Sequence, residues 1–395
     1  MSNAPLPGTP RLLRAINDRA ALELLLARGP LTRSQIGELT GLSKVTASQL
    51  VERLVSRGLV SGVGEQAGGR GPNAQLYAVR AESAYVVGVD IGPEHVVASS
   101  ADIRGTVHSR IQLSTKDNDD PVGVVHRAVM QAAESAHAPL RDVRRVVLGT
   151  PGLVDPTTGD LAFAFDLPRW QRGLLAALRD DLSIPVSFEN DVNLVAVAEA
   201  HGGAAQGVDD FILLWAGRGV GLAIMIGGRL HRGYTGAAGE IGWMPVAGAQ
   251  VYRDPSHKTK GGFQQLVSTD PVRAIAREHG FKAATGAAAV TAAVQAGTAG
   301  GPVLDEIASR LAVGIASACV VLDPPLVVLA GEINQAGGQA LAQRVEHEVA
   351  AIAPVAPRVV VSAGPEEPIV DGALRTALLA VRDEVFGSTV EEMAG

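Results

Sequence analysis

The sequence predicts an α/β protein in two parts: a winged helix-turn-helix head over residues 1–80 and a two-lobed α/β body over residues 81–395. Two observations carry this prediction. In the head, helical patterns around a glycine turn are followed by a hairpin pattern with a glycine-rich tip. In the body, short apolar strands alternate with helical stretches over a length that needs two lobes with a cleft between them.

The composition is typical of a soluble globular protein. Of the 395 residues, 47% are apolar and 19% are charged, and no apolar run reaches the roughly 20 residues that a membrane span needs. The N-terminus lacks a signal-peptide layout, so we expect a cytoplasmic protein without a membrane partner. The single cysteine, Cys319, excludes an intramolecular disulfide, and its place on an apolar helical stripe predicts a buried thiol.

Charge is distributed unevenly along the chain. Ten Lys and Arg against five Asp and Glu give the head a net charge of +5, which leaves −12 for the body. A basic head on an acidic body indicates that only the head meets a polyanion.

Two helices open the head. Hydrophobic spacing predicts the first over residues 11–28. Thr32, followed three residues later by Gln35, predicts a capping box at the start of the second helix, and Gly41 ends it because glycine can turn the chain with positive φ. A helix and a tight glycine turn are the layout that presents a further helix to the DNA major groove.

The helix that follows is the predicted recognition helix. Ala47, Leu50 and Leu54 face inward at helical spacing. The outward side chains are hydroxyls, an amide and one cation, which can reach base edges and phosphates. We predict that the DNA-binding residues of this helix and its N-cap are Ser43, Lys44, Thr46, Ser48 and Gln49.

Residues 59–79 alternate apolar positions around a Gly-rich tip and predict a hairpin, or wing. At the tip, GGRGP holds Arg70 between glycines and a proline, a shape that can enter an A·T-rich minor groove. Packing alone can produce a helix-turn-helix pattern, and a Gly-rich loop can be a plain linker. Together with the +5 charge, however, these features favour double-stranded operator DNA as a partner.

The body begins with a predicted strand at YVVGVDIG (residues 85–92), and VVASSAD follows at hairpin distance. A helical stretch near residues 121–137 and a strand at residues 144–150 come next. Two late strands, at residues 325–332 and 358–362, each stand beside a helical segment. Such alternation is typical of an α/β architecture.

Six body motifs occur in a fixed order: GVDIG, GTPGLVD, ENDVN, AGRGVGLAIMIGGRL, RGYTGAAGEIGWMPV and VVLAGE. Their order resembles that of the ROK family, named for its repressors, open reading frames and kinases, and the head resembles the winged helix of its repressor branch. The resemblance implies an actin-like, sugar-kinase fold of two α/β lobes, usually dimeric. We expect lobe one over about residues 81–190 plus a C-terminal helix at about residues 369–386, and lobe two over about residues 191–368.

The phosphate loops depart from the pattern of ROK kinases. Phosphoryl transfer depends on a phosphate cradle. Where kinases read Asp-x-Gly-Gly-Thr, this chain places Pro93 and Glu94 after Asp90-Ile91-Gly92, which removes an amide donor and adds a negative charge. In the second loop, Arg218 follows Gly217, where kinases tend to show threonine. Arg218 either pairs with an anion or fills the empty nucleotide space.

The sugar-binding residues of the family pattern match this chain better than the phosphate loops do. Asn190 and Asp191 match the family's sugar-binding pair, in which the aspartate serves kinases as the base, and Glu240 matches a sugar-contacting glutamate. Asn190 also stands at the predicted start of a helix, so it can be an N-cap, a sugar ligand or both.

The zinc segment of the family has been lost. Most members have a histidine at the position of Trp243, which ligates zinc and contacts the sugar, followed by a cysteine cluster and a glutamate. In this chain, Phe263 stands where one of the cysteines would be, and Gln265 stands where the glutamate would be. Because a zinc site needs about four ligands and only His257 is near, we expect no metal and no cofactor. Trp243 either packs on a sugar ring or fills the volume vacated by zinc. The predicted ligand-binding residues are Asn190, Asp191, Glu240, Trp243 and Gln265.

These features predict a transcriptional repressor and not an enzyme. We expect the head to bind an operator as part of a homodimer, with pairing of dimers into tetramers left open, and the body to bind a sugar or sugar derivative as effector. One alternative is an active sugar kinase with a DNA-binding head, which Asp191 favours and which Pro93 and Glu94 oppose. The other is a regulator that acts through a protein partner without a small ligand.

Overall fold

The computed structural model describes residues 10–66, 73–116, 120–164, 173–247 and 262–391. In the head, Thr32 and Gln35 form the predicted capping box, Gly41 ends the second helix at φ +73°, and Ser43 caps the third. The prediction of a winged helix-turn-helix is confirmed. Its elements are α1 (Pro10–Arg28), α2 (Arg33–Thr40), α3 (Lys44–Ser56) and a sheet of order β1-β3-β2, formed by β1 (Leu31–Thr32), β2 (Val60–Gln66) and β3 (Ala74–Val79).

Lobe one contains a mixed sheet of order β10-β7-β4-β5-β6. β4, β7 and β10 run parallel, while β4, β5 and β6 form an antiparallel meander. Apolar side chains of α4 and α5 cover one face. The elements are η1 (Ala81–Ser83), β4 (Tyr85–Ile91), β5 (His95–Asp102), β6 (Ile111–Ser114), α4 (Pro121–Ser135), η2 (Leu140–Asp142), β7 (Val143–Thr150), the ribbon β8 (Gly152–Val154) and β9 (Leu161–Ala164), α5 (Leu174–Leu182) and β10 (Val186–Asn190).

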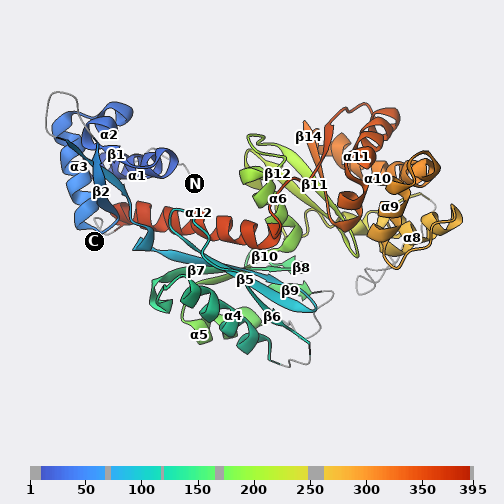
Figure 1. Cartoon of the computed structure of the whole chain (residues 1–395), viewed down its shortest axis with the longest axis horizontal. Helices are drawn as coiled ribbons and strands as arrows, with labels where there is room; N and C mark the ends of the chain where they lie inside the picture. Colours follow the sequence, from blue (N-terminus) through green and yellow to red (C-terminus); the bar gives the residue numbers. More distant parts are fainter. Residues whose placement is uncertain (1–9, 67–72, 117–119, 165–172, 248–261, 392–395) are drawn as a thin grey trace.

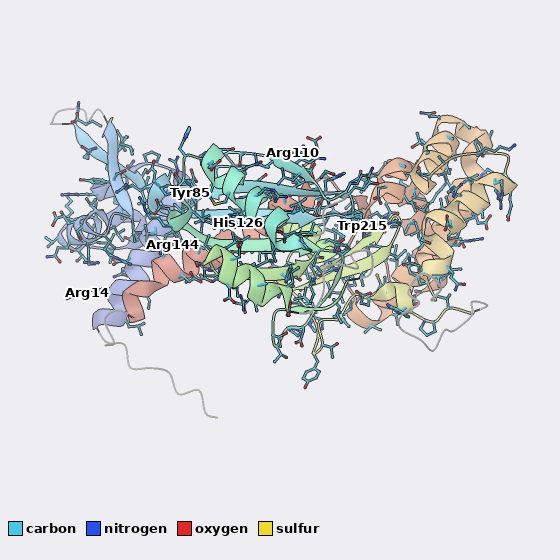
Figure 2. The ribbon with its side chains drawn as sticks, turned by 90° about the horizontal axis from the view of Figure 1, so that it is seen from below. Arg14, Tyr85, Arg110, His126, Arg144 and Trp215 are labelled. Carbon is cyan, nitrogen blue, oxygen red and sulfur yellow. The ribbon has the colours of Figure 1, made fainter. Side chains whose placement is uncertain are left out.

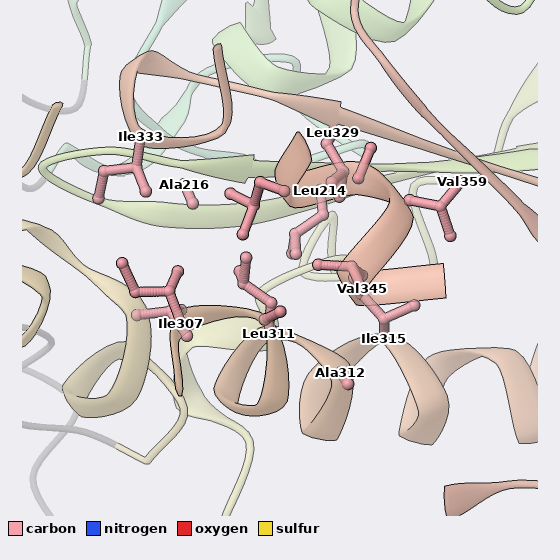
Figure 3. Packing of buried hydrophobic residues seen from close by; sticks show 14 of the residues in the cluster. Leu214, Ala216, Ile307, Leu311, Ala312, Ile315, Leu329, Ile333, Val345 and Val359 are labelled. Atoms are coloured by element: carbon pink, nitrogen blue, oxygen red, sulfur yellow. The ribbon is translucent and has the colours of Figure 1, made fainter. Parts of the chain in front are cut away.

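Lobe two contains a second sheet, of order β13-β12-β11-β14-β15. Figure 3 shows Leu214 and Leu329 of this sheet facing Ile307, Leu311 and Ile315 of α10 across the hydrophobic core. The elements are β11 (Phe211–Ala216), β12 (Val220–Ile226), β13 (Arg229–Leu230), η3 (Ile241–Trp243), α7 (Gln264–Val267), α8 (Thr269–Glu278), α9 (Gly286–Gln295), η5 (Gly297–Gly300), α10 (Gly301–Leu322), β14 (Leu326–Ala330), α11 (Glu332–Ile352) and β15 (Arg358–Val361).

Two helices connect the lobes. α6 (Asp191–Gly202) packs Val192, Val195 and Ala196 against the far face of the lobe-two sheet, and it also packs on α12 (Pro368–Glu391). α12 lies along the lobe-one sheet and reaches from α6 to the head (Figure 1). These two helices therefore place the head, lobe one and lobe two relative to one another.

The head shares its hydrophobic core with lobe one. One continuous cluster includes Leu22 and Leu54 of the head, Val86 of β4, and Leu378 and Phe386 of α12. Polar contacts reinforce the junction. Arg19 pairs with Asp383 at 2.6 Å, and the guanidinium group of Arg57 donates to the carbonyl oxygen of Val385 at 3.4 Å. Within the head, the buried Asp18 carboxylate accepts two hydrogen bonds from Arg53. The head is thus a packed extension of lobe one.

Two further expectations from the sequence can be compared with the structure. Cys319 is fully buried on α10, as its place on the apolar stripe predicts, and burial raises the pKa of its thiol to about 11. Over the described ranges, no helix combines the length and the apolar character that crossing a membrane requires.

Candidate functional site

A cavity of about 460 Å³ lies where the two lobes meet. Chain segments far apart in sequence contribute its walls: the end of β4, the loop after β7, the start of α6, the turn between β11 and β12, and the starts of α11 and α12. Trp215, which lines it, lies toward the middle of the molecule in Figure 2. The polar or charged side chains on its walls are Asp90, Asn190, Asp191, Asn193, Arg218, Glu240, Gln264 and Glu332.

The start of α6 positions two of the predicted ligand-binding residues. Asn190 is the N-cap, because its side-chain oxygen accepts from the amide of Asn193 at 3.2 Å, and its side-chain nitrogen donates to the Gly152 carbonyl at 3.0 Å. Asp191 follows in the first turn, where the positive end of the helix dipole favours a carboxylate. Asn190 therefore caps the helix and also lines the cavity.

Glu189 organises this corner and was not identified from the sequence. Its buried carboxylate accepts from the Asn190 amide at 3.0 Å and from the Asn193 side chain at 2.9 Å. Arg232, in lobe two, donates to its other oxygen at 2.6 and 2.7 Å. The ion pair thus ties the loop that leads to Glu240 onto lobe one beside Asn190.

Asp90 faces the same corner from the end of β4. Burial, together with the nearby negative charge of Asp191, raises the pKa of Asp90 from 3.8 to about 7. The Asp90 carboxyl is therefore partly protonated near neutral pH and can donate as well as accept a hydrogen bond.

The turn after Asp90 is poorly suited to phosphates. The Gly92 amide donates to the His95 carbonyl at 2.9 Å, and Pro93 has no amide to offer. Gly92 and Pro93 nevertheless line the cavity, so backbone donors are missing where the kinase pattern would place them. For Pro93 this geometry agrees with the sequence argument against ATP, whereas Glu94 is exposed and does not line the cavity.

The turn between β11 and β12 forms the opposite wall. A Cβ atom on Gly217 would overlap the Glu332 carboxylate, so the turn lies directly against the start of α11. Arg218 and Glu332 both line the cavity, and the Gln264 side chain accepts from the Val220 amide at 3.1 Å. Sequence reasoning did not select Glu332 or Gln264, although VVLAGE and the lost zinc segment contain them.

The five residues predicted to bind ligand do not all meet. Asn190, Asp191 and Glu240 lie on the cavity wall. Trp243, at the end of η3, and Gln265, on α7, are half-buried and do not line this cavity. Gln264 occupies the wall in place of Gln265, because a shift of one residue on a helix turns the side chain by about 100°.

Within the described residues, no group of three or more His, Cys, Asp and Glu side chains could hold a metal ion, and His257 lies outside them. The expectation that the protein binds no metal remains a prediction.

The predicted DNA-binding residues lie at the start of α3. Ser43, Lys44, Thr46 and Gln49 are exposed. Ser48 is half-buried, accepts from Arg33 at 3.1 Å and donates to Glu52 at 3.2 Å. Arg70 lies outside the described residues.

Arg33 was not identified from the sequence as part of this surface. Its guanidinium lies 5.2 Å from the centre of the Tyr77 ring, above the wing strand β3, and pairs with Glu52 at 3.5 Å. Arg33 therefore connects α2, the recognition helix and the wing.

A winged helix joined to a two-lobed body with a cavity between the lobes defines a DNA-binding protein built on a sugar-kinase fold. The chain belongs to the ROK family, whose model matches residues 86–373, and a model of the MarR family matches residues 16–71.

Similar proteins include regulators and kinases. The DNA-binding transcriptional dual regulator NagC of Escherichia coli (strain K12) is 25% identical over 352 residues, which cover 83% of each chain. The xylose repressor of Bacillus subtilis (strain 168) is 26% identical over 59% of this chain and 61% of its own. A ROK family transcriptional regulator, described as a homolog of the E. coli MLC protein, has a TM-score of 0.76 at 19% identity over 96% of this chain and 99% of its own. The ROK hexokinase of Thermus thermophilus has a TM-score of 0.65 at 24% identity over 76% of this chain and 99% of its own. These structural matches confirm the predicted fold.

Proposed function

We propose that the protein is a sugar-responsive transcriptional repressor, whose head binds operator DNA and whose body binds a sugar without phosphorylating it. One observation carries the proposal. In the sugar-kinase cavity, Gly92 and Pro93 of the phosphate turn offer no amide donors, and α12 links this cavity to the head, which carries the exposed recognition helix. A DNA partner places the protein in the cytoplasm.

The cavity and the head communicate through α12. Ile369, near its start, lines the cavity, and Asp383 and Val385, near its other end, contact Arg19 and Arg57 of the head. A sugar that binds better to one arrangement of the lobes shifts the population toward that arrangement. The difference in its affinity for the two arrangements sets the change in DNA binding.

We propose that the DNA-binding form is a homodimer. Two heads can read the two half-sites of a palindromic operator, and a twofold dimer supplies them in matching orientation.

A sugar panel tests the proposal. Relatives are named for N-acetylglucosamine and for xylose, so these sugars come first. A sugar that binds only the folded protein raises its melting temperature. Operator fragments selected from random DNA should then bind more weakly or more strongly when that sugar is added. A panel without any shift, beside intact DNA binding, would favour a regulator controlled by a protein partner.

We expect no sugar-dependent release of ADP in a coupled assay, because the turn at Gly92 and Pro93 offers no phosphate cradle. The Thermus thermophilus hexokinase is the positive control for the assay. Turnover in the wild type that disappears in Asp191→Asn would establish the kinase alternative, with Asp191 as the base.

DNA binding should weaken steeply with salt, since the net charge of +5 on the head displaces counterions from phosphates. Replacement of the exposed Lys44 by alanine should lower the slope of log K against log salt by about one. Lys116→Ala, an equal loss of charge on an exposed residue of lobe one, is the matched control. Identical slopes for wild type and Lys44→Ala would remove Lys44 from the interface.

A further inference from the structure

The chain passes between α6 and the lobe-two sheet, and back to α12, through two crossings. Residues 203–210 lead from α6 to β11, and residues 362–367 lead from β15 to α12. Because the crossings are covalent, any rotation of one lobe relative to the other must turn about them. Hinges of this kind consist of a few residues at the ends of helices and strands.

A single carboxylate holds both crossings. Glu199, on α6, is fully buried. One of its oxygens accepts from the Ala204 amide of the first crossing at 2.6 Å. The other accepts from the Ser362 hydroxyl at 2.5 Å and from the Gly364 amide at 2.7 Å, both in the second crossing. A buried carboxylate is costly unless several donors surround it, and these donors come from both crossings.

Two glycines permit this approach. A Cβ atom on Gly203 would overlap the Glu199 carboxylate, and one on Gly364 would lie 2.6 Å from its oxygen, closer than a real contact allows. The crossings therefore have no side chain at the points where they meet Glu199. Both segments contact the same group at or next to these glycines, through the amides of Ala204 and Gly364.

We propose that Glu199 is the pivot of lobe movement, a positioning residue that joins the two crossings into one hinge. Without it, each crossing moves independently and the lobes no longer keep one closing direction. The cavity lies between lobe one and the lobe-two sheet on which α6 packs, and the start of α6, at Asp191 and Val192, lines it. The consequence for sensing rests on the proposed function, but the pivot is a property of the free protein.

The test uses the full chain without sugar or DNA, so its result does not depend on the proposed function. Glu199→Gln removes the negative charge and replaces one acceptor oxygen by an NH2 group, which cannot accept from the backbone amides. Amide exchange at Ala204 and Gly364 should then accelerate about tenfold or more, the loss expected for a charged hydrogen bond. Ser362→Ala removes only one donor and should produce a smaller change of the same kind. Glu134→Gln, the same substitution at an exposed site on α4, is the matched control.

Distances between the lobes provide the second readout. Spin labels can be attached after Ser135→Cys in lobe one and Gln295→Cys in lobe two, both exposed, because the native Cys319 is buried and stays unlabelled. We expect a narrow distance distribution in the wild type and in Glu134→Gln, and a broader one in Ser362→Ala and, most of all, in Glu199→Gln. Unchanged distributions in both hinge variants would overturn the proposal. So would accelerated exchange spread evenly over both sheets in Glu199→Gln with an unchanged Ser362→Ala, because Glu199 would then stabilise the whole fold.

Discussion

Asp90→Asn should stabilise the protein more at pH 8 than at pH 5, by about 2 to 3 kcal/mol. The pKa of Asp90 is raised from 3.8 to about 7 in the folded protein. Between these values the folded state holds a proton that the unfolded state has lost, so stability falls as pH rises from about 4 to 7. Asparagine does not titrate, so the Asp90→Asn variant does not lose this part of its stability as pH rises. The difference between pH 5 and pH 8 covers about two pKa units, each worth about 1.4 kcal/mol.

Urea unfolding of wild type and variant at the two pH values measures this difference. Asp180→Asn, on the exposed side of α5, removes the same charge without burial and is the control. Equal stabilisation by Asp90→Asn at both pH values would contradict the raised pKa. If Asp90→Asn raises the free energy of unfolding more at pH 8 than at pH 5, the cavity keeps the carboxyl pair of Asp90 and Asp191 although this pair destabilises the protein.

Asp191→Asn should weaken binding of the effector about tenfold to a hundredfold, because a charged acceptor for sugar hydroxyls is worth about 1.5 to 3 kcal/mol. The structure places Asp191 on the cavity wall at the start of α6. Because α6 packs on the end of α12 that is remote from the head (Figure 1), DNA binding without sugar should be unchanged. In a kinase the same change would instead abolish turnover with a smaller effect on affinity.

Calorimetry with the best sugar of the panel, beside an operator-binding assay, separates the two outcomes. Asp180→Asn again controls for the loss of one negative charge. An unchanged sugar affinity in Asp191→Asn would exclude its carboxylate from the ligand contacts and would direct attention to Asn190, Glu240 and Gln264.

Local chemistry made much of the fold predictable. The capping box at Thr32, the turn at Gly41 and the cap at Ser43 each depend on residues a few positions apart, and all three occur in the structure. The wing follows from apolar residues on both sides of a glycine-rich tip, and the hairpin of β4 with β5 follows from two short apolar runs at hairpin distance.

Contacts between distant segments were not predictable from these patterns. Gln264 lines the cavity and Gln265 does not, because helix register and not residue type decides which amide faces inward. In the sequence, Glu189 and Glu199 resemble ordinary glutamates, one just before a helix and one within it. Their importance depends on Arg232, Ser362 and Gly364, more than 40 residues away in the chain.

The shared core of head and lobe one also bears on the order in which the protein folds during synthesis. The head core around Leu22 and Leu54 is completed by Leu378 and Phe386 of α12, more than 320 residues later in the chain. At about 5 to 20 residues per second, a ribosome takes about 15 to 60 s to make that interval. The nascent head must therefore keep part of its apolar surface exposed for that time. Among the described parts of the protein, the DNA-binding head is the first to be made and one of the last to be finished.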